Sequence, residues 1–280
     1  MTISKPNLPK SLFLQSCREG LSCIRPLMPG LNDEWGWNHG AARAPSYAAY
    51  GRMRAILAVT ESEELRPAKV LEVAAGDASL VASLQARTGC EVWANDLREE
   101  NLRQAVGSFS NASKIRLAPG NLFELDSLAP HMQFDLVVAC EVIEHVAHGV
   151  DFLRKLGDLT KPGGRILVTT PNGAHFRNRL PSYYEIPDHS VLEKDQFKPD
   201  ADGHLFLIHP AEMVRMAQEA GLAVERLSLW GSPFITGHFG VRVLGPILPS
   251  RVSLALEDWV ISSPVREKLS FAMSVVLRRN

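Results

Sequence analysis

Two glutamates and a histidine stand close together near the middle of the chain. Glu141, Glu144 and His145 are spaced i, i+3 and i+4, which places them on one face of a helix or helical turn. Two carboxylates and an imidazole can ligate Mg²⁺, Mn²⁺, Fe²⁺ or Zn²⁺. A neutral His145 can instead accept the proton of an attacking hydroxyl. The spacing therefore predicts a metal site or a general base, while pairing of Glu144 with His145 without any metal stays an alternative.

Two further carboxylates belong to short apolar runs. Glu72 lies in KVLEVA, residues 69–74, and Asp96 ends EVWAND, residues 91–96. A carboxylate at such a strand end can accept hydrogen bonds from both hydroxyls of an adenosine ribose. The small residues 74–78 (AAGDA) suit a tight turn whose backbone approaches a ligand. This spacing suits NAD as well as other adenosine cofactors, and a structural role for each carboxylate is the alternative.

Apolar runs alternate with helical stretches along most of the chain. The predicted strands are 69–74, 91–96, 115–118, 134–140, 165–170, 222–230 and 271–277, and K-P-G-G at 161–164 is predicted to make a turn before the fifth. Alternation of this kind implies right-handed crossovers and a parallel sheet. We therefore predict an α/β fold: a Rossmann-like, seven-stranded, mostly parallel sheet with helices on both faces. Ligands of such sheets bind at the carboxyl ends of strands, where the strand order reverses.

The pattern divides the chain into two parts. Residues 1–64 are expected to form an irregular and helical cap, and residues 65–280 the main domain, with insertions at about 171–208 and 232–268. Long connections are usually functional or mobile. Tyr183 and Tyr184 in the first insertion could line an acceptor pocket or form the loop's own core. The second insertion could be a lid, a homodimer contact or a channel for an apolar acceptor, although core packing explains most of its apolar residues.

Composition narrows the function classes. The net charge is −1 with a pI near 6.8, so nothing indicates a general polyanion binder, and nucleic acid is not the expected partner. The four cysteines form no C-x-x-C pair. No signal peptide and no apolar run of transmembrane length is visible. We expect a cytoplasmic protein without a transmembrane segment, for which peripheral contact with a membrane stays open.

Six stretches in a fixed order resemble class I S-adenosylmethionine-dependent methyltransferases. They are VLEVAAGDASL, EVWANDL, APGNLFEL, FDLVVACEVIEHV, LTKPGGRILVTTPN and HLFLIHPAEMVRMAQEAGL. The resemblance, which extends from residue 69 to about 230, implies S-adenosyl-L-methionine as the cofactor. It also implies a role for each of several residues: Glu72, Ala74 and Gly76 would hold the methionine part, Asp96 the ribose, Asn121 and Leu122 the adenine, and Cys140 and Glu141 the amino-acid end.

The E-V-I-E-H segment is similar to that of ubiquinone-biosynthesis O-methyltransferases and of small-RNA 2′-O-methyltransferases. In the RNA enzymes both glutamates and the histidine bind a divalent metal together with a later histidine, which by motif position is His204 here. The resemblance thus implies a metal set of Glu141, Glu144, His145 and His204. His145 and His204 are also the leading candidates for a catalytic base.

The glycine loop departs from the family's pattern, because Ala74 and Ala78 replace two glycines and Asn121 stands where aspartate is common. Alanine is readily accepted in such a loop only where φ is negative. The expected function is O-methylation of a small hydroxylated acceptor: a sugar, a glycan or a quinone-like phenol. Two alternatives are RNA 2′-O-methylation, which the near-neutral charge disfavours, and a non-catalytic scaffold subunit that binds the cofactor.

Overall fold

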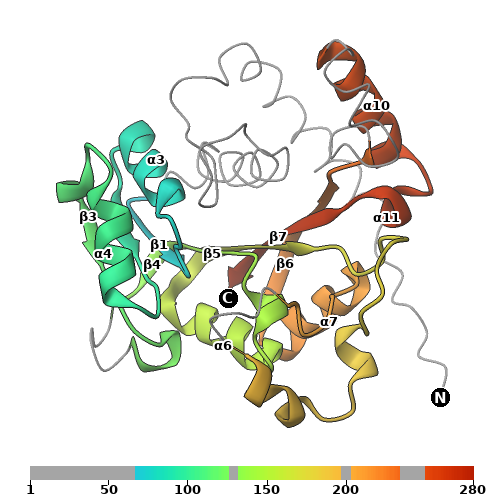
Figure 1. Ribbon diagram of the computed structural model, residues 1–280, viewed down its shortest axis with the longest axis horizontal. Helices are drawn as coiled ribbons and strands as arrows, with labels where there is room; N and C mark the ends of the chain where they lie inside the picture. Colours follow the sequence, from blue (N-terminus) through green and yellow to red (C-terminus); the bar gives the residue numbers. More distant parts are fainter. Residues whose placement is uncertain (1–66, 126–131, 197–202, 234–249) are drawn as a thin grey trace.

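The computed structural model describes residues 67–125, 132–196, 203–233 and 250–280. Seven strands form one sheet in the order β3-β2-β1-β4-β5-β7-β6 (Figure 1). β7 runs antiparallel to both of its neighbours, and the other pairings are parallel. The strands are β1 Lys69–Val73, β2 Glu91–Ala94, β3 Ile115–Leu117, β4 Phe134–Cys140, β5 Thr160–Pro171, β6 Leu222–Trp230 and β7 Ala272–Arg279. The predicted mostly parallel sheet is confirmed.

Helices cover both faces of the sheet, as predicted. Helices α3 (Ser79–Thr88) and α4 (Glu99–Gly107) pack on one face, where Leu84 and Leu102 join a buried cluster with Val70 of β1. Helices α6 (Gly149–Leu159) and α7 (Pro210–Glu219) pack on the other (Figure 1), where Leu153 and Met213 cluster with Leu71. Because strand side chains alternate between faces, the neighbours Val70 and Leu71 serve two different cores.

Local sequence sets the ends of these helices. Helix α3 ends at Gly89, whose φ of 70° is the left-handed conformation that stops a helix and lets its N–H donate to Gln85 O. Helix α7 begins with Pro210 in its first turn, and the Glu212 carboxylate accepts the backbone N–H of His209 at 2.9 Å. Gly89 thus ends α3 just before β2 begins, and Pro210 and Glu212 set the start of α7.

The predicted turn at residues 161–164 lies inside β5. Thr160 pairs with Phe134 and Arg165 with Leu136, so the K-P-G-G residues form a bulge within the strand. The Asp135 carboxylate fixes the bulge, because Oδ1 accepts from Lys161 Nζ at 2.6 Å while Oδ2 accepts from the β1 backbone. The prediction of a separate turn before β5 was therefore wrong.

The first insertion returns to the sheet through isolated bridges that join Asn172 to Ile208 and Ser182 to Leu207. It contains the 3₁₀ turns η5 (Tyr183–Glu185) and η6 (His189–Asp195). Tyr183 is 5% exposed, stacks on His189 with 4.1 Å between ring centroids, and belongs to the α6/α7 core. Of the two roles considered for Tyr183, the structure supports the loop's own core.

The second insertion is described in its later part, with helices α10 (Ser250–Ser262) and α11 (Arg266–Leu269). Buried Glu257 of α10 accepts the backbone N–H groups of Gly231 and Ser232, both at 2.8 Å, which fastens α10 to the end of β6. The predicted cap at 1–64 and residues 234–249 lie outside the described residues. Among the helices of the described ranges, none has the length and apolar character needed to cross a bilayer.

Candidate functional site

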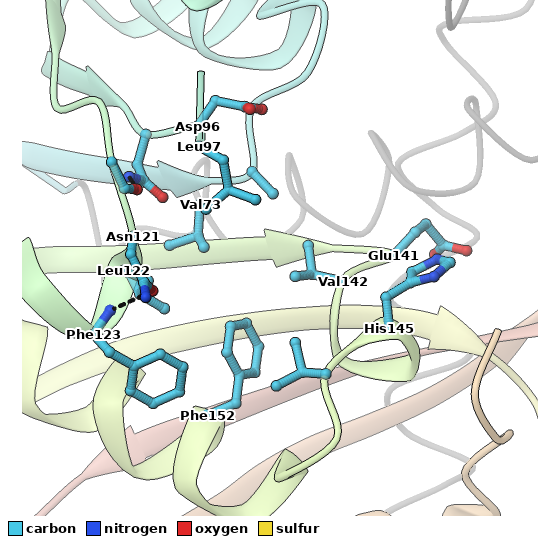
Figure 2. A pocket seen from close by; sticks show the side chains of 14 residues that line it. Val73, Asp96, Leu97, Asn121, Leu122, Phe123, Glu141, Val142, His145 and Phe152 are labelled. Atoms are coloured by element: carbon cyan, nitrogen blue, oxygen red, sulfur yellow. Dashed lines mark hydrogen bonds between the residues drawn. The ribbon is translucent and has the colours of Figure 1, made fainter. Parts of the chain in front are cut away.

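A cavity of about 280 Å³ opens at the carboxyl ends of β1, β2 and β4. The strand order reverses between β1 and β4, so this is the edge at which ligands of doubly wound sheets bind. Figure 2 shows Asp96 and Leu97 on one side of the cavity, Asn121 and Phe123 on another, and His145 at the far end. The volume lies near the lower limit of small-molecule sites, which hold about 300–1,000 Å³.

The turn after β1 has an unusual backbone. Ala74, Gly76 and Ala78 all have positive φ, at 52°, 54° and 58°. Asp96 follows β2 and its Oδ2 accepts the N–H of Gly76 at 3.0 Å. This bond ties the ribose carboxylate expected from the sequence to the turn, and both Asp96 and Ala74 line the cavity. Gly76 does not line it and acts through its bond to Asp96.

Glu72 supports the turn from below. It is buried, and its Oε2 accepts the N–H of Val81 in the first turn of α3 at 3.1 Å. A carboxylate at a helix N-terminus is stabilised by the unpaired N–H groups and the helix dipole. The resemblance implied that Glu72 contacts the cofactor. In the structure Glu72 does not line the cavity, and its carboxylate contacts the start of α3.

The end of the cavity where the resemblance implies adenine is lined by Asn121 and Leu122, together with residues that sequence reasoning missed. Asn121 Oδ1 accepts the N–H of Phe123 at 3.1 Å, which shapes the 3₁₀ turn η3 (Leu122–Glu124). The missed lining residues include Leu97, Phe123 and Phe152. Leu97 and Phe123 are 50% and 43% exposed, and large apolar side chains exposed beside a cavity are a recognised sign of a binding surface.

The neighbouring residues Cys140 and Glu141, at the end of β4, lie in different surroundings. Cys140 packs against the α3/α4 core and does not line the cavity. Glu141 does line it, with a φ of 56° that turns the chain sharply out of the strand. Its N–H donates to Thr169 O and its Oε1 accepts from Thr169 Oγ1, both at 2.8 Å. Glu141 is thus held against the cavity, where the resemblance implies the amino-acid end of the cofactor.

Glu144, His145 and His204 form a cluster beside the cavity. One possible ligand atom from each lies within 4.8 Å of the others. Glu144 and His145 belong to the 3₁₀ turn η4 (Ile143–His145), and the N–H of Leu205 donates to Glu144 O at 2.9 Å, which brings His204 alongside. Three of the four residues in the predicted metal set are therefore adjacent, while Glu141 lies outside this cluster.

The cluster combines a buried carboxylate with two imidazoles. Glu144 is 0% exposed, and its Oε2 accepts from Thr170 Oγ1 at 2.9 Å while its Oε1 lies 3.9 Å from His204 Nε2. Burial and the neighbouring His145, whose ring centroid is 5.0 Å from that of His204, lower the pKa of His204 below its usual value. His204 is consequently neutral near pH 7, with a nitrogen lone pair for an ion or a proton.

Comparison with known proteins decides the family. Residues 46–227 match a family model described as a methyltransferase domain. The chain belongs to this methyltransferase family. It is 31% identical over 161 residues to the ubiquinone biosynthesis O-methyltransferase of Aeromonas salmonicida (strain A449), a match that covers 57% of this chain and 65% of that protein. This methyltransferase therefore spans slightly less than two thirds of that relative's length.

Two further similarities extend over more of the chain. The ubiquinone/menaquinone biosynthesis C-methyltransferase UbiE of Burkholderia cenocepacia (strain HI2424) is 30% identical over 207 residues, which cover 69% of this methyltransferase and 83% of that protein. The solved structure of an S-adenosylmethionine-dependent methyltransferase from Mesorhizobium loti has 16% identity and a TM-score of 0.52, and the match covers 83% of this chain and 98% of that one. The structural likeness supports the fold.

The cavity of this methyltransferase fits the cofactor's chemistry. The Asp96 carboxylate can accept from ribose hydroxyls, the apolar side chains of Leu97 and Phe123 suit an adenine ring, and the Glu141 carboxylate suits the positive amino group of the methionine part. The possible ligand atoms of Glu144, His145 and His204 lie within 4.8 Å of one another. Ligand atoms at about 2.0–2.2 Å from one metal lie roughly 3–3.5 Å apart, so these three side chains would have to move slightly closer together to bind an ion.

We expect Ala74→Gly to stabilise this methyltransferase. Left-handed backbone costs a non-glycine residue about 1–2 kcal/mol, and the greater freedom of glycine in the unfolded chain takes back about 0.4–1 kcal/mol. Because Ala74 is exposed, no packing is lost, and urea unfolding should show a gain of about 0.5–1 kcal/mol. Ala78→Gly is the matched comparison: its methyl group is fully buried, so it should gain less. A loss of stability in Ala74→Gly would contradict the left-handed geometry of the turn.

Proposed function

We propose that this methyltransferase transfers the methyl group to an oxygen of a small hydroxylated acceptor, at the end of the cavity where His145 lies. One observation carries the proposal: His145 lines the cofactor cavity and also belongs to the cluster with Glu144 and His204. The groups able to receive a proton or hold an ion therefore adjoin the place to which the cofactor's methyl group would be delivered.

Methyl transfer to oxygen needs little from the protein beyond alignment and removal of one proton. The acceptor oxygen attacks the methyl carbon of the sulfonium, the carbon–sulfur bond breaks, and S-adenosylhomocysteine leaves with the electron pair. The acceptor's hydroxyl proton passes to neutral His204 or His145. A divalent ion at the cluster would lower the pKa of a bound hydroxyl and could hold two adjacent oxygens. Glu144 would supply the negative charge that either arrangement requires.

The relatives favour an aromatic acceptor. The Aeromonas protein is named as an O-methyltransferase of ubiquinone biosynthesis and the Burkholderia protein as a C-methyltransferase of ubiquinone and menaquinone biosynthesis. A quinone-like phenol is accordingly our first choice, with a sugar or glycan second. The cluster favours oxygen over carbon, because two imidazoles and a carboxylate are suited to deprotonating or ligating a hydroxyl.

A paired acceptor test examines this proposal. The protein is incubated with S-adenosylmethionine and either a catechol or the same ring carrying a single hydroxyl, and the products are analysed by mass spectrometry and NMR. We expect O-methylation, with kcat/KM for the catechol about 100-fold higher, equivalent to about 2.7 kcal/mol from a second ligated oxygen. A ring-methylated product would overturn the choice of oxygen. Binding of S-adenosylhomocysteine without turnover on phenols, catechols and sugars would favour a scaffold role.

A further inference from the structure

Two consecutive threonines, Thr169 and Thr170, lie directly before Pro171, the last residue of β5. Thr169 and Thr170 are both fully buried. Thr169 Oγ1 donates to Glu141 Oε1 at 2.8 Å, and Thr170 Oγ1 donates to Glu144 Oε2 at 2.9 Å. Each hydroxyl has one proton to donate, so each threonine holds one glutamate.

The strand geometry explains why neighbouring residues hold different partners. Side chains alternate along a strand, and Leu167 packs into the α3/α4 core while Val168 packs into the α6/α7 core. Thr169 and Thr170 continue that alternation. Thr169 pairs in register with Cys140, directly before Glu141, whereas Thr170 reaches the 3₁₀ turn that carries Glu144.

We propose that Thr169 and Thr170 are positioning residues that assign the two glutamates to different tasks, Thr169 holding Glu141 for the cofactor and Thr170 holding Glu144 for the cluster with His145 and His204. The Thr170 half of this inference depends on the proposed function, because it assumes that the cluster takes a divalent ion.

The hydrogen bond from Thr170 fixes how the Glu144 carboxylate is turned. With Oε2 of Glu144 bound to Thr170, Oε1 is the oxygen that faces His204 Nε2, 3.9 Å away. Partners that orient a ligating side chain typically change metal affinity about 10- to 100-fold when removed. Glu141 accepts the Thr169 hydroxyl, and its own backbone N–H donates to Thr169 O, so loss of the hydroxyl alone should disturb Glu141 less.

Thr169→Val and Thr170→Val form a matched pair, since each replaces one buried hydroxyl by a methyl group at adjacent positions of one strand. Calorimetry with the full chain measures Mn²⁺ and S-adenosylhomocysteine separately. Thr170→Val should weaken Mn²⁺ binding about 10- to 100-fold and leave S-adenosylhomocysteine binding within about twofold. Thr169→Val should weaken S-adenosylhomocysteine binding about 3- to 10-fold and leave Mn²⁺ binding within about twofold.

Serine variants separate positioning from general damage. Thr169→Ser and Thr170→Ser keep the hydroxyl and should restore the affected ligand to within about threefold of wild type. Equal losses for both ligands in both valine variants, or no recovery with serine, would overturn the inference. Absence of Mn²⁺ binding by the wild-type protein would overturn the metal part of the proposed function and the Thr170 half, while S-adenosylhomocysteine binding would still decide the Thr169 half.

Discussion

Removal of divalent ions is expected to lower turnover of this methyltransferase on the proposed hydroxylated acceptor about 100- to 1,000-fold, because a metal that ligates an attacking oxygen would supply several kcal/mol of transition-state stabilisation. Dialysis against a chelator, followed by a methyl-transfer assay, measures the loss. Mg²⁺, Mn²⁺, Fe²⁺ and Zn²⁺ are then added back singly. The cluster contains one carboxylate and two imidazoles, so Mn²⁺, Fe²⁺ or Zn²⁺ should restore more activity than Mg²⁺.

Glu144→Gln should reproduce the effect of the chelator. Glutamine keeps the side chain's size and can still accept from Thr170, but it removes the negative charge that an ion requires. Glu193→Gln is the control. Glu193 belongs to the η6 turn, is exposed and pairs with His148, so its replacement should leave turnover unchanged. Turnover that resists chelation would refute the metal. It would leave His204 or His145 as the base. If the base is His204, activity should fall only at a pH below the usual histidine pKa, because burial and the neighbouring His145 lower the pKa of His204.

Replacement of Asp96 by alanine is expected to weaken S-adenosylhomocysteine binding about 10- to 100-fold, the equivalent of about 1.5–3 kcal/mol for hydrogen bonds to a charged group. Asp96 lines the cavity and accepts the N–H of Gly76, so the variant loses the ribose acceptor and also loosens the turn after β1. Calorimetric titration measures the change in affinity.

Two comparisons make the Asp96 result specific. Asp96→Asn keeps one acceptor oxygen and should lose less affinity than Asp96→Ala. Glu99→Ala removes an exposed carboxylate of α4 that pairs with Arg103, and should have no effect. If a folded Asp96→Ala protein bound the cofactor as tightly as wild type, the ribose would lie elsewhere, and the whole arrangement of the cavity would need revision.

The sheet could be predicted because local patterns determine it. Buried strands such as β1 and β4 are short apolar runs bounded by polar residues, and Gly89 and Pro210 mark helix ends with strong backbone preferences. The β5 bulge was missed because its cause is a contact distant in the sequence, between Asp135 and Lys161. A Pro-Gly-Gly sequence is typical of a turn when no such contact is known.

Site residues that belong to the ordered motifs could be predicted from the sequence. Site residues that depend on contacts between separate elements could not. Asp96, Asn121 and Leu122 follow strands of the motif order and line the cavity. His204 was reached through resemblance alone, since spacing could not show that Leu205 pairs with Glu144 O. The lining roles of Phe123 and Phe152 depend on how separate elements pack.

Glycine-to-alanine departures were visible in the sequence, but the conformation at those positions was not. Ala74 and Ala78 both have positive φ, the region that alanine avoids. Each of these alanines therefore holds the turn at an energetic cost of about 1–2 kcal/mol, which the burial of the Ala78 methyl group helps to offset at that position.

The cavity and the cluster of Glu144, His145 and His204 draw on different segments of the chain. Among the described residues, those that line the cavity lie between Val73 and Phe152, whereas His204 reaches the cluster from the segment that follows η6. Insertions or substitutions between Asn172 and Ile208 could therefore change the surroundings of His204 during evolution without changing the residues that line the cavity. The pair of bridges that closes this segment, at Asn172–Ile208 and Ser182–Leu207, marks the natural boundary for exchanging it between related enzymes.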